Sequence, residues 1–206
     1  MSTSSSRNGG GGRINARRLL VLSVLAVSLM PAPALAAADE STRDGDVKVT
    51  EKSGVYTVSA CFRIPQTAAV VLGVLTDYEA IPRFMPGMKT SIVMAREAGH
   101  VTVQQEAVSR FMLFSKRVHL LLDITETPHK LTFRDRSGRS FRRYEGAWTI
   151  TEREGSTEVL YELIAEPAFE VPQMILKRLL GRDSSAMIDG LRQEMAARAG
   201  RGAHTR

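Results

Sequence analysis

The sequence predicts an α+β domain in which a curved, seven-stranded antiparallel sheet wraps around one long C-terminal helix. Three observations carry this prediction. Apolar helical stretches occupy residues 65–85, six strand-like stretches separated by short turns occupy residues 90–166, and a long helical pattern follows Pro172. A strongly curved sheet does not pack tightly on a single helix, so this order of elements also predicts an apolar cavity between the sheet and the helix.

One strand and two short helices begin the predicted domain. Apolar side chains alternate from Val55 to Ile64, which is typical of a strand with one buried face. Pro65 stands where a helix begins, and the apolar helical pattern continues to near Asp77. A shorter helix follows from Glu79 to Met85, and Pro86-Gly87 ends it. We therefore expect two short helices between the first and second strands.

The remaining strands and the final helix follow from alternation, turn residues and helical spacing. The six further strands are expected at Thr90 to Ala95, Val101 to Phe111, Val118 to Ile124, Leu131 to Arg136, Phe141 to Thr151 and Val159 to Glu166. From Ile175 to Met195, apolar residues recur at helical spacing, which predicts a long amphipathic helix. Gly181 and Gly190 are weak positions in that helix, at which a bend would fall.

Residues 1–38 have the features of a secretory signal peptide. Arg17 and Arg18 belong to a set of four arginines that precede or adjoin an apolar run from Leu19 to Met30, and Ala34-Leu35-Ala36 is a small-residue cleavage pattern. The run is shorter than the roughly 20 apolar residues that a membrane-spanning helix needs. We therefore expect cleavage near Ala36 to Ala38 and a periplasmic or secreted protein, exported by either the general or the twin-arginine route.

The rest of the chain is expected to form one domain. We predict a flexible leader at residues 39–46, a folded domain at residues 47–199 and a flexible tail at residues 200–206. The whole chain has 28 basic and 22 acidic residues, but four arginines lie in the signal peptide, so the mature protein has 24 against 22, a formal charge of +2. That small charge, without any nucleic-acid-binding motif, predicts no nucleic-acid partner.

No residue pattern indicates catalysis, a metal or a cofactor. The four histidines lack the paired spacing that places two imidazoles on one metal ion. The sequence has neither a nucleophile elbow nor a glycine-rich phosphate loop after a strand. Cys61 is the only cysteine, which excludes an internal disulfide, and we expect it to be a small buried strand residue and not a nucleophile. We expect no catalytic residue, no metal and no cofactor.

Strand alternation and the apolar helix faces predict which side chains line the cavity. The expected ligand-binding residues are Phe84, Met85, Val103, Gln105, Phe111, Leu120, Leu122, Phe133, Tyr144, Trp148, Tyr161, Leu163, Ile175, Leu179 and Met187. Any apolar member of this set would equally serve as sealed core. The polar members Gln105, Tyr144 and Tyr161, together with Ser109, need hydrogen-bond partners, which are protein groups, water or the polar part of a ligand.

Three parts of the chain carry a resemblance to a known superfamily. The stretch from Val74 to Met88, the Tyr144-Glu145-Gly146-Ala147-Trp148 segment and the long terminal helix resemble the START-like, Bet v 1-like (SRPBCC) superfamily. They are most similar to its branch of polyketide cyclase/dehydrase-type and coenzyme Q-binding proteins, over Asp46 to Ala199. The resemblance implies a helix-grip fold. It leaves the activity open, because the superfamily contains lipid carriers, ligand sensors and enzymes.

The leading functional prediction is exported, non-catalytic binding or transport of a hydrophobic small molecule, such as a lipid, an isoprenoid quinone or a polyketide-like compound. The quinone is implied only by the resemblance. One alternative is a cyclase, aromatase or dehydrase that would use Tyr144, Tyr161, Arg110 or Glu106. Strand alternation places Arg110 and Glu106 opposite to Gln105, so we expect them to point outward. The other alternative is an envelope protein-interaction module.

A basic cluster surrounds one predicted hairpin turn. Its members are Arg134, Arg136, Arg139, Arg142 and Arg143. In a carrier, such a cluster would allow transient contact with a membrane surface, because each basic residue near anionic headgroups contributes roughly 1 kcal/mol. The alternative interpretation is a solvated hairpin with no partner.

Overall fold

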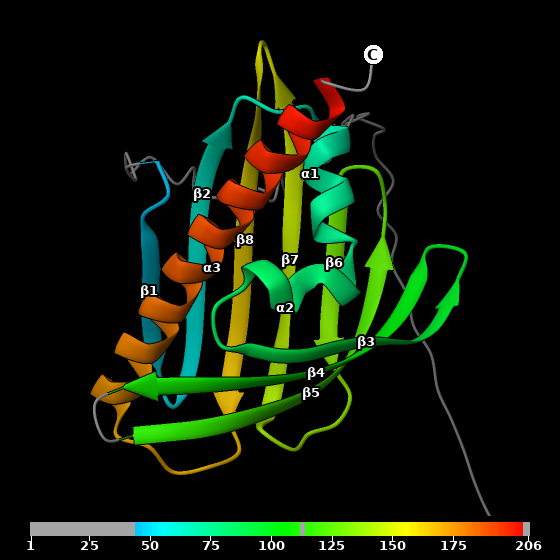
Figure 1. Cartoon of the computed structure of the whole chain (residues 1–206). Helices are drawn as coiled ribbons and strands as arrows, with labels where there is room; N and C mark the ends of the chain where they lie inside the picture. The colour runs from blue at the N-terminus through cyan, green and yellow to red at the C-terminus, as the bar shows by residue number, and fades with distance from the viewer. Residues whose placement is uncertain (1–43, 112–113, 204–206) are drawn as a thin grey trace, which may run out of the picture. The chain divides into compact units, whose positions relative to one another are not determined.

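The described part of the protein is built on one antiparallel sheet. The computed structural model describes residues 44–111 and 114–203, which lie in the second of the two units of the chain, Glu40–Arg206. The strand order is β1-β2-β8-β7-β6-β5-β4-β3. The sheet curves, and the long helix α3 lies across its concave face, with α1 and α2 packed beside that helix (Figure 1). This is the helix-grip arrangement that the sequence predicts.

The elements follow the predicted order with one addition. The strands are β1 (Val47–Lys52), β2 (Val55–Ile64), β3 (Met88–Glu97), β4 (His100–Phe111), β5 (Phe114–Glu126), β6 (Lys130–Asp135), β7 (Phe141–Arg153) and β8 (Ser156–Pro167). The helices are α1 (Ala68–Leu75), the 3-10 helix η1 (Tyr78–Ala80), α2 (Ile81–Phe84) and α3 (Gln173–Ala203).

The prediction of seven strands was wrong by one, because β1 was missed. β1 forms a hairpin with β2, with Val47 opposite Ala60 and Lys52 opposite Val55. It is an edge strand whose side chains are half-buried or exposed, and charged or polar residues occupy every second position. An edge strand with few apolar residues gives a weak alternation signal. The two short helices therefore lie between the second and third strands.

Local capping sets where the first helix starts and stops. Thr67 is the N-cap, and its side-chain oxygen accepts a hydrogen bond from the Val70 N–H at 3.4 Å. The helix therefore begins at Ala68, three residues after the predicted Pro65. At the other end the Thr76 hydroxyl donates to the Leu72 carbonyl at 2.8 Å. The chain then turns into η1 and α2, which lead directly to β3.

Two predicted boundaries also change. The Arg63 N–H donates to the Asp44 carboxylate at 2.7 Å, and the Gly45 N–H donates to the Cys61 carbonyl at 2.9 Å. The end of the predicted flexible leader is thus attached to β2. Likewise α3 continues to Ala203, into the predicted tail. The predicted signal peptide lies outside the described residues and stays a prediction.

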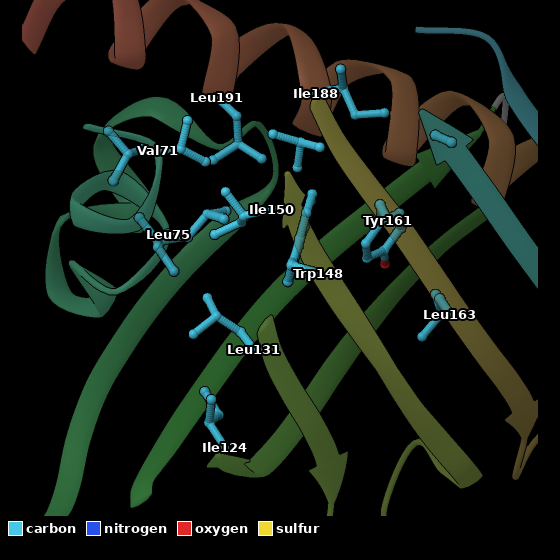
Figure 2. Packing of buried hydrophobic residues seen from close by; sticks show 14 of the residues in the cluster. Val71, Leu75, Ile124, Leu131, Trp148, Ile150, Tyr161, Leu163, Ile188 and Leu191 are labelled. Carbon is cyan, nitrogen blue, oxygen red and sulfur yellow. The ribbon is translucent and has the colours of Figure 1, made fainter. Parts of the chain in front are cut away.

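The core lies between the sheet and the C-terminal half of α3. Ile188, Leu191 and Met195 of α3 are almost fully buried, and they pack against residues of the sheet and of α1. Figure 2 shows Leu191 near Val71 of α1, above Ile150 of β7. α3 runs unbroken through Gly181 and Gly190. This end of the domain is filled, and the opposite end is hollow.

Candidate ligand-binding cavity

A cavity of about 620 Å³ lies between the concave face of the sheet, the N-terminal half of α3 and the segment from α1 to the start of β3. Small-molecule sites in proteins usually have volumes of about 300–1,000 Å³. Most of the wall is apolar. Ile124, Leu131, Trp148 and Leu163, which belong to this wall, appear below α3 in Figure 2. The predicted cavity is therefore present, and it is large enough for a small hydrophobic molecule.

Most of the predicted ligand-binding side chains lie in this wall, because strand alternation assigns the inward face correctly. They are Met85, Gln105, Leu120, Leu122, Phe133, Tyr144, Trp148, Tyr161, Leu163, Leu179 and Met187. The structure thus brings together side chains from β4, β5, β6, β7, β8 and α3. Whether each contacts a ligand stays a prediction.

Three other predicted residues, Val103, Phe84 and Ile175, do not lie in the cavity wall. Val103 is fully buried in the sealed core, and Phe84 packs at the edge of that core. Ile175 is half-buried, and the neighbouring Leu176 takes the inward position on the helix face that also carries Leu179 and Met187. Phe111 ends β4, but its side chain lies outside those that are described.

Sequence reasoning also missed several residues of the wall. Val118 and Ile124 continue the alternation of Leu120 and Leu122 on β5, so the same signal would have found them. Leu131 likewise alternates with Phe133 on β6. Phe169 comes from the irregular connection between β8 and α3. No periodic pattern in the sequence indicates a residue of that kind.

The polar side chains of the wall have identifiable partners. The Gln105 side-chain NH₂ donates to the Ser91 hydroxyl at 3.1 Å. The Ser109 hydroxyl donates to the Asp183 carboxylate and so connects β4 to α3. The Tyr78 hydroxyl donates to Glu126 Oε1 at 2.7 Å. Burial and this bond to a carboxylate together raise the pKa of Tyr78.

Tyr144 and Tyr161, the tyrosine pair, lie in the cavity wall and are surrounded by protein. Their hydroxyl groups lie close enough to influence each other's pKa. Burial raises the pKa of Tyr144 to about 12 and raises the pKa of Tyr161 as well. Tyr144 keeps some accessible surface because its ring faces the cavity, although protein surrounds it. Both phenols are therefore neutral at physiological pH.

Aromatic rings enclose the tyrosine pair. The centroid of the Phe133 ring lies 6.0 Å from that of Tyr144 and 6.5 Å from that of Tyr161. The Trp148 and Tyr161 centroids are 4.3 Å apart, and those of Phe141 and Tyr144 are 4.9 Å apart. Such ring pairs stabilise packing beyond the burial of area alone. They hold the two hydroxyl groups in a fixed, apolar surrounding.

Cationic side chains stand at the open part of the cavity. We call Lys89, Arg110, Lys116 and Arg182 the cationic rim. Lys116 Nζ lies 4.2 Å from the centroid of the Phe169 ring, and Arg182 pairs with the adjacent Asp183 at 2.6 Å. Arg110 is exposed, as predicted from strand alternation, yet it borders the opening. Glu106, also predicted to point outward, pairs with His119 Nδ1 at 3.0 Å and is not part of the wall.

The described residues do not gather metal-ligating side chains at one place. Among residues 44–111 and 114–203, no group of three or more His, Cys, Asp and Glu side chains is placed to hold a metal ion. Cys61 is half-buried on the outward side of β2, so the prediction of a buried position was only partly right. Its thiol pKa is raised, mainly by burial, so the reactive thiolate is disfavoured.

The predicted basic cluster is largely neutralised by neighbouring carboxylates. Arg134 and Arg143 both pair with Glu145. Arg136 pairs with Asp123 at 3.2 Å, and Arg142 pairs with Glu166 at 2.7 Å. Within the described part of the chain, only Arg139 of this cluster lacks an ion pair. The free positive charge at this hairpin is thus smaller than the sequence suggests.

The fold and the cavity define a START-like domain of the hydrophobic-ligand-binding kind. Residues 64–192 match the family described as polyketide cyclase / dehydrase and lipid transport, and the chain belongs to this family. The predicted resemblance is therefore confirmed. A search of curated proteins gives no match.

Solved structures show the same fold at low sequence identity. TTHA0849 from Thermus thermophilus is 22% identical with a TM-score of 0.61, and the alignment covers 68% of this chain and 97% of that one. Zhui aromatase/cyclase from a Streptomyces species is 12% identical with a TM-score of 0.62, over 70% and 96% of the two chains. A STAR-related lipid transfer protein from Xanthomonas axonopodis is 15% identical with a TM-score of 0.55, over 73% and 99%. Enzymes and lipid carriers thus share this fold.

Proposed function

We propose that this protein binds and carries a hydrophobic small molecule in its cavity, without catalysing a reaction on it. The ligand would be a lipid, an isoprenoid quinone or a polyketide-like compound. The observation that carries the proposal is the mostly apolar cavity of about 620 Å³ between the sheet and α3. A hydrophobic ligand that enters an apolar space of this size leaves water, and this burial of apolar surface drives binding.

We also propose that the mature domain works in the periplasm or outside the cell. The charged, apolar and small-residue segments of residues 1–38 support this part of the proposal. A fusion of residues 1–38 to an export reporter tests it. Export of the reporter with cleavage near Ala36 to Ala38 is the expected result. Retention of the uncleaved fusion in the cytoplasm would contradict it.

Native mass spectrometry of the mature domain, purified from the envelope of its own host, is the primary test. We expect a mass increment that organic extraction releases as a lipid, quinone or polyketide-like compound. A dissociation-constant series with alkyl ketones of increasing chain length tests the cavity directly. Each methylene that the cavity buries should tighten binding by about 0.8 kcal/mol, until the cavity is full. A purified domain that carries nothing and binds no member of the series would overturn the proposal.

A cyclase or dehydrase is the second candidate, favoured by the phenol groups in the cavity. Such an enzyme needs an acid or base that titrates near the working pH. The pKa of Tyr144 is raised to about 12, which makes it a poor proton-transfer group at neutral pH. Glu106 pairs with His119 away from the cavity wall. These two observations favour a binding function over a catalytic one. Conversion of a bound poly-ketone by the purified domain would contradict this preference.

Membrane contact through the five arginines of the hairpin is a weaker part of the proposal. Four of them already pair with carboxylates, so each gains less from anionic headgroups than an unpaired arginine does. We therefore expect weak, salt-sensitive co-sedimentation with vesicles that contain phosphatidylglycerol and none with pure phosphatidylcholine. Equal binding to both kinds of vesicle would contradict an electrostatic contact.

A further inference from the structure

The tyrosine pair occupies a space that Gly146 keeps open. Tyr144, Gly146 and Trp148 follow one another on the inward face of β7, and Trp148 lies opposite Tyr161 of β8. A Cβ at position 146 would approach the Phe133 ring to 2.6 Å and the Glu162 carbonyl oxygen to 2.2 Å. The absence of a side chain at Gly146 therefore lets the Phe133 ring pack against both tyrosines of the pair.

The pair has one proton more than it uses. Two phenols carry two O–H protons, and a bond between them would use only one. Tyr161 is buried, whereas Tyr144 keeps accessible surface beside the cavity, so the Tyr144 hydroxyl is the one that a ligand reaches. No other hydrogen bond of Tyr144 is formed within the described part of the chain. The Tyr144 proton is thus available to a molecule in the cavity.

We propose that the Tyr144 hydroxyl donates a hydrogen bond to an uncharged carbonyl oxygen of the ligand, which selects hydrophobic ketones or esters over hydrocarbons and over carboxylates. This inference rests on the proposed binding function and names its ligand class. Tyr161 has the part of a positioning residue in this proposal, because its O–H, by donating to the nearby Tyr144 oxygen, would leave the Tyr144 proton for the ligand.

The surroundings of the pair decide between a neutral and an anionic ligand group. Phe133, Phe141 and Trp148 surround it, and the four cations that border the cavity belong to the rim. A carboxylate placed beside Tyr144 would lose its hydration without gaining a countercharge, which is costly. A carbonyl loses much less and gains one hydrogen bond. A hydrocarbon ligand in the same place would leave the Tyr144 O–H without an acceptor.

Three naphthalene probes of nearly the same shape test the inference by calorimetry: methyl naphthyl ketone, isopropenylnaphthalene and naphthoate. The wild-type domain should bind the ketone more tightly than naphthoate. Y144F should weaken ketone binding about tenfold and leave isopropenylnaphthalene binding unchanged or tighter. Y161F should weaken ketone binding by a smaller factor and spare the hydrocarbon. A purely structural role of either residue would affect both probes alike.

Tyr78 provides the matched control. It also lines the cavity, but its hydroxyl already donates to Glu126. Y78F should therefore change ketone and hydrocarbon binding by the same factor. Thermal unfolding of each variant establishes that it is folded before titration.

Infrared spectroscopy of the bound ketone reports on the hydrogen bond itself and not on the affinity. A hydrogen bond from Tyr144 should lower the carbonyl stretching frequency below its value in hexane, and Y144F should restore the hexane value. A wild-type frequency equal to that in hexane would overturn the inference. An equal weakening of ketone and hydrocarbon binding in Y144F would also overturn the inference, although the proposed binding function would still stand. Failure of every probe to bind would overturn both the inference and the proposed function.

Discussion

The two halves of α3 have different roles. The C-terminal half carries Ile188 and Met195, which are sealed against α1 and the sheet. The N-terminal half carries Leu179 and Met187, which border the cavity. One helix therefore contributes a closed core at one end and an open binding surface at the other. Stability and binding are thus separated along the length of α3, so variants of one half should leave the property of the other half largely intact.

A matched pair of methionines gives the largest expected effect. Met195 has no exposed surface, whereas Met187 is half-buried beside the cavity. Met195→Ala should lower the free energy of unfolding by about 3 kcal/mol, because it removes a fully packed side chain. Met187→Ala should lower the free energy of unfolding by only about 1 kcal/mol, because part of this side chain faces the cavity and makes no packing contacts there. Urea unfolding measures both, and equal losses would contradict the division of α3.

A pair of glycines in the same helix should give effects of opposite sign. A Cβ at Gly190 would lie 2.1 Å from the Phe84 carbonyl oxygen, so Gly190→Ala must push α2 away and should cost about 2 kcal/mol. At Gly181 the nearest atom outside the helix is Val49 Cγ2 at 3.6 Å, an ordinary contact. Gly181→Ala should therefore stabilise the protein by about 0.5–1 kcal/mol. Thermal or urea unfolding checks both signs.

The tyrosine pair should make the hollow end sensitive to alkaline pH. The folded-state pKa of Tyr144 is raised from 10.0 to about 12, so its contribution to stability is fully present below pH 10. As pH rises further, the unfolded state loses the proton first. Stability should then fall by about 1.4 kcal/mol per pH unit from this group, until the folded state also ionises. Urea unfolding across this range should show a shallower fall for Y144F than for the wild type. Identical slopes would contradict the raised pKa.

The hydrogen bond between Ser109 and Asp183 should affect ligand release more than stability. It joins β4 to the N-terminal half of α3, and both residues border the cavity. Ser109→Ala should cost no more than about 1 kcal/mol of unfolding free energy. It should also speed dissociation of a bound ketone severalfold in stopped-flow measurements. Ser185→Ala, which removes a bond to the Gly181 carbonyl within the helix, is the control and should leave the release rate unchanged.

Much of the fold could be predicted from the sequence, since the strands with a strongly apolar face and the long helix have clear periods. The polar strand β1 could not be predicted in this way, because its apolar alternation depends on only two valines, Val47 and Val49. Gly190 was interpreted as a weak point of the helix, whereas the structure gives it a close contact with the Phe84 carbonyl. Only the tertiary arrangement distinguishes these two roles.

The candidate site was predicted less completely than the fold. Alternation along β7 and β8 placed Tyr144, Trp148 and Tyr161 on the inward side. It gave no information on how close the two tyrosine hydroxyl groups come to each other, because that depends on how the strands curve. No periodic pattern could identify Phe169, because it lies in the irregular connection between β8 and α3.

The position of Trp148 gives the cavity an optical reporter. It is the single tryptophan of the chain, and it stands in the cavity wall with its ring centroid 4.3 Å from that of Tyr161. Its emission therefore comes from one place only, where a ligand would displace water or bring in a quenching group. Crude lipid extracts added to the unlabelled protein should change that emission whenever they contain a molecule that enters the cavity, so the ligand can be sought before anyone knows what it is.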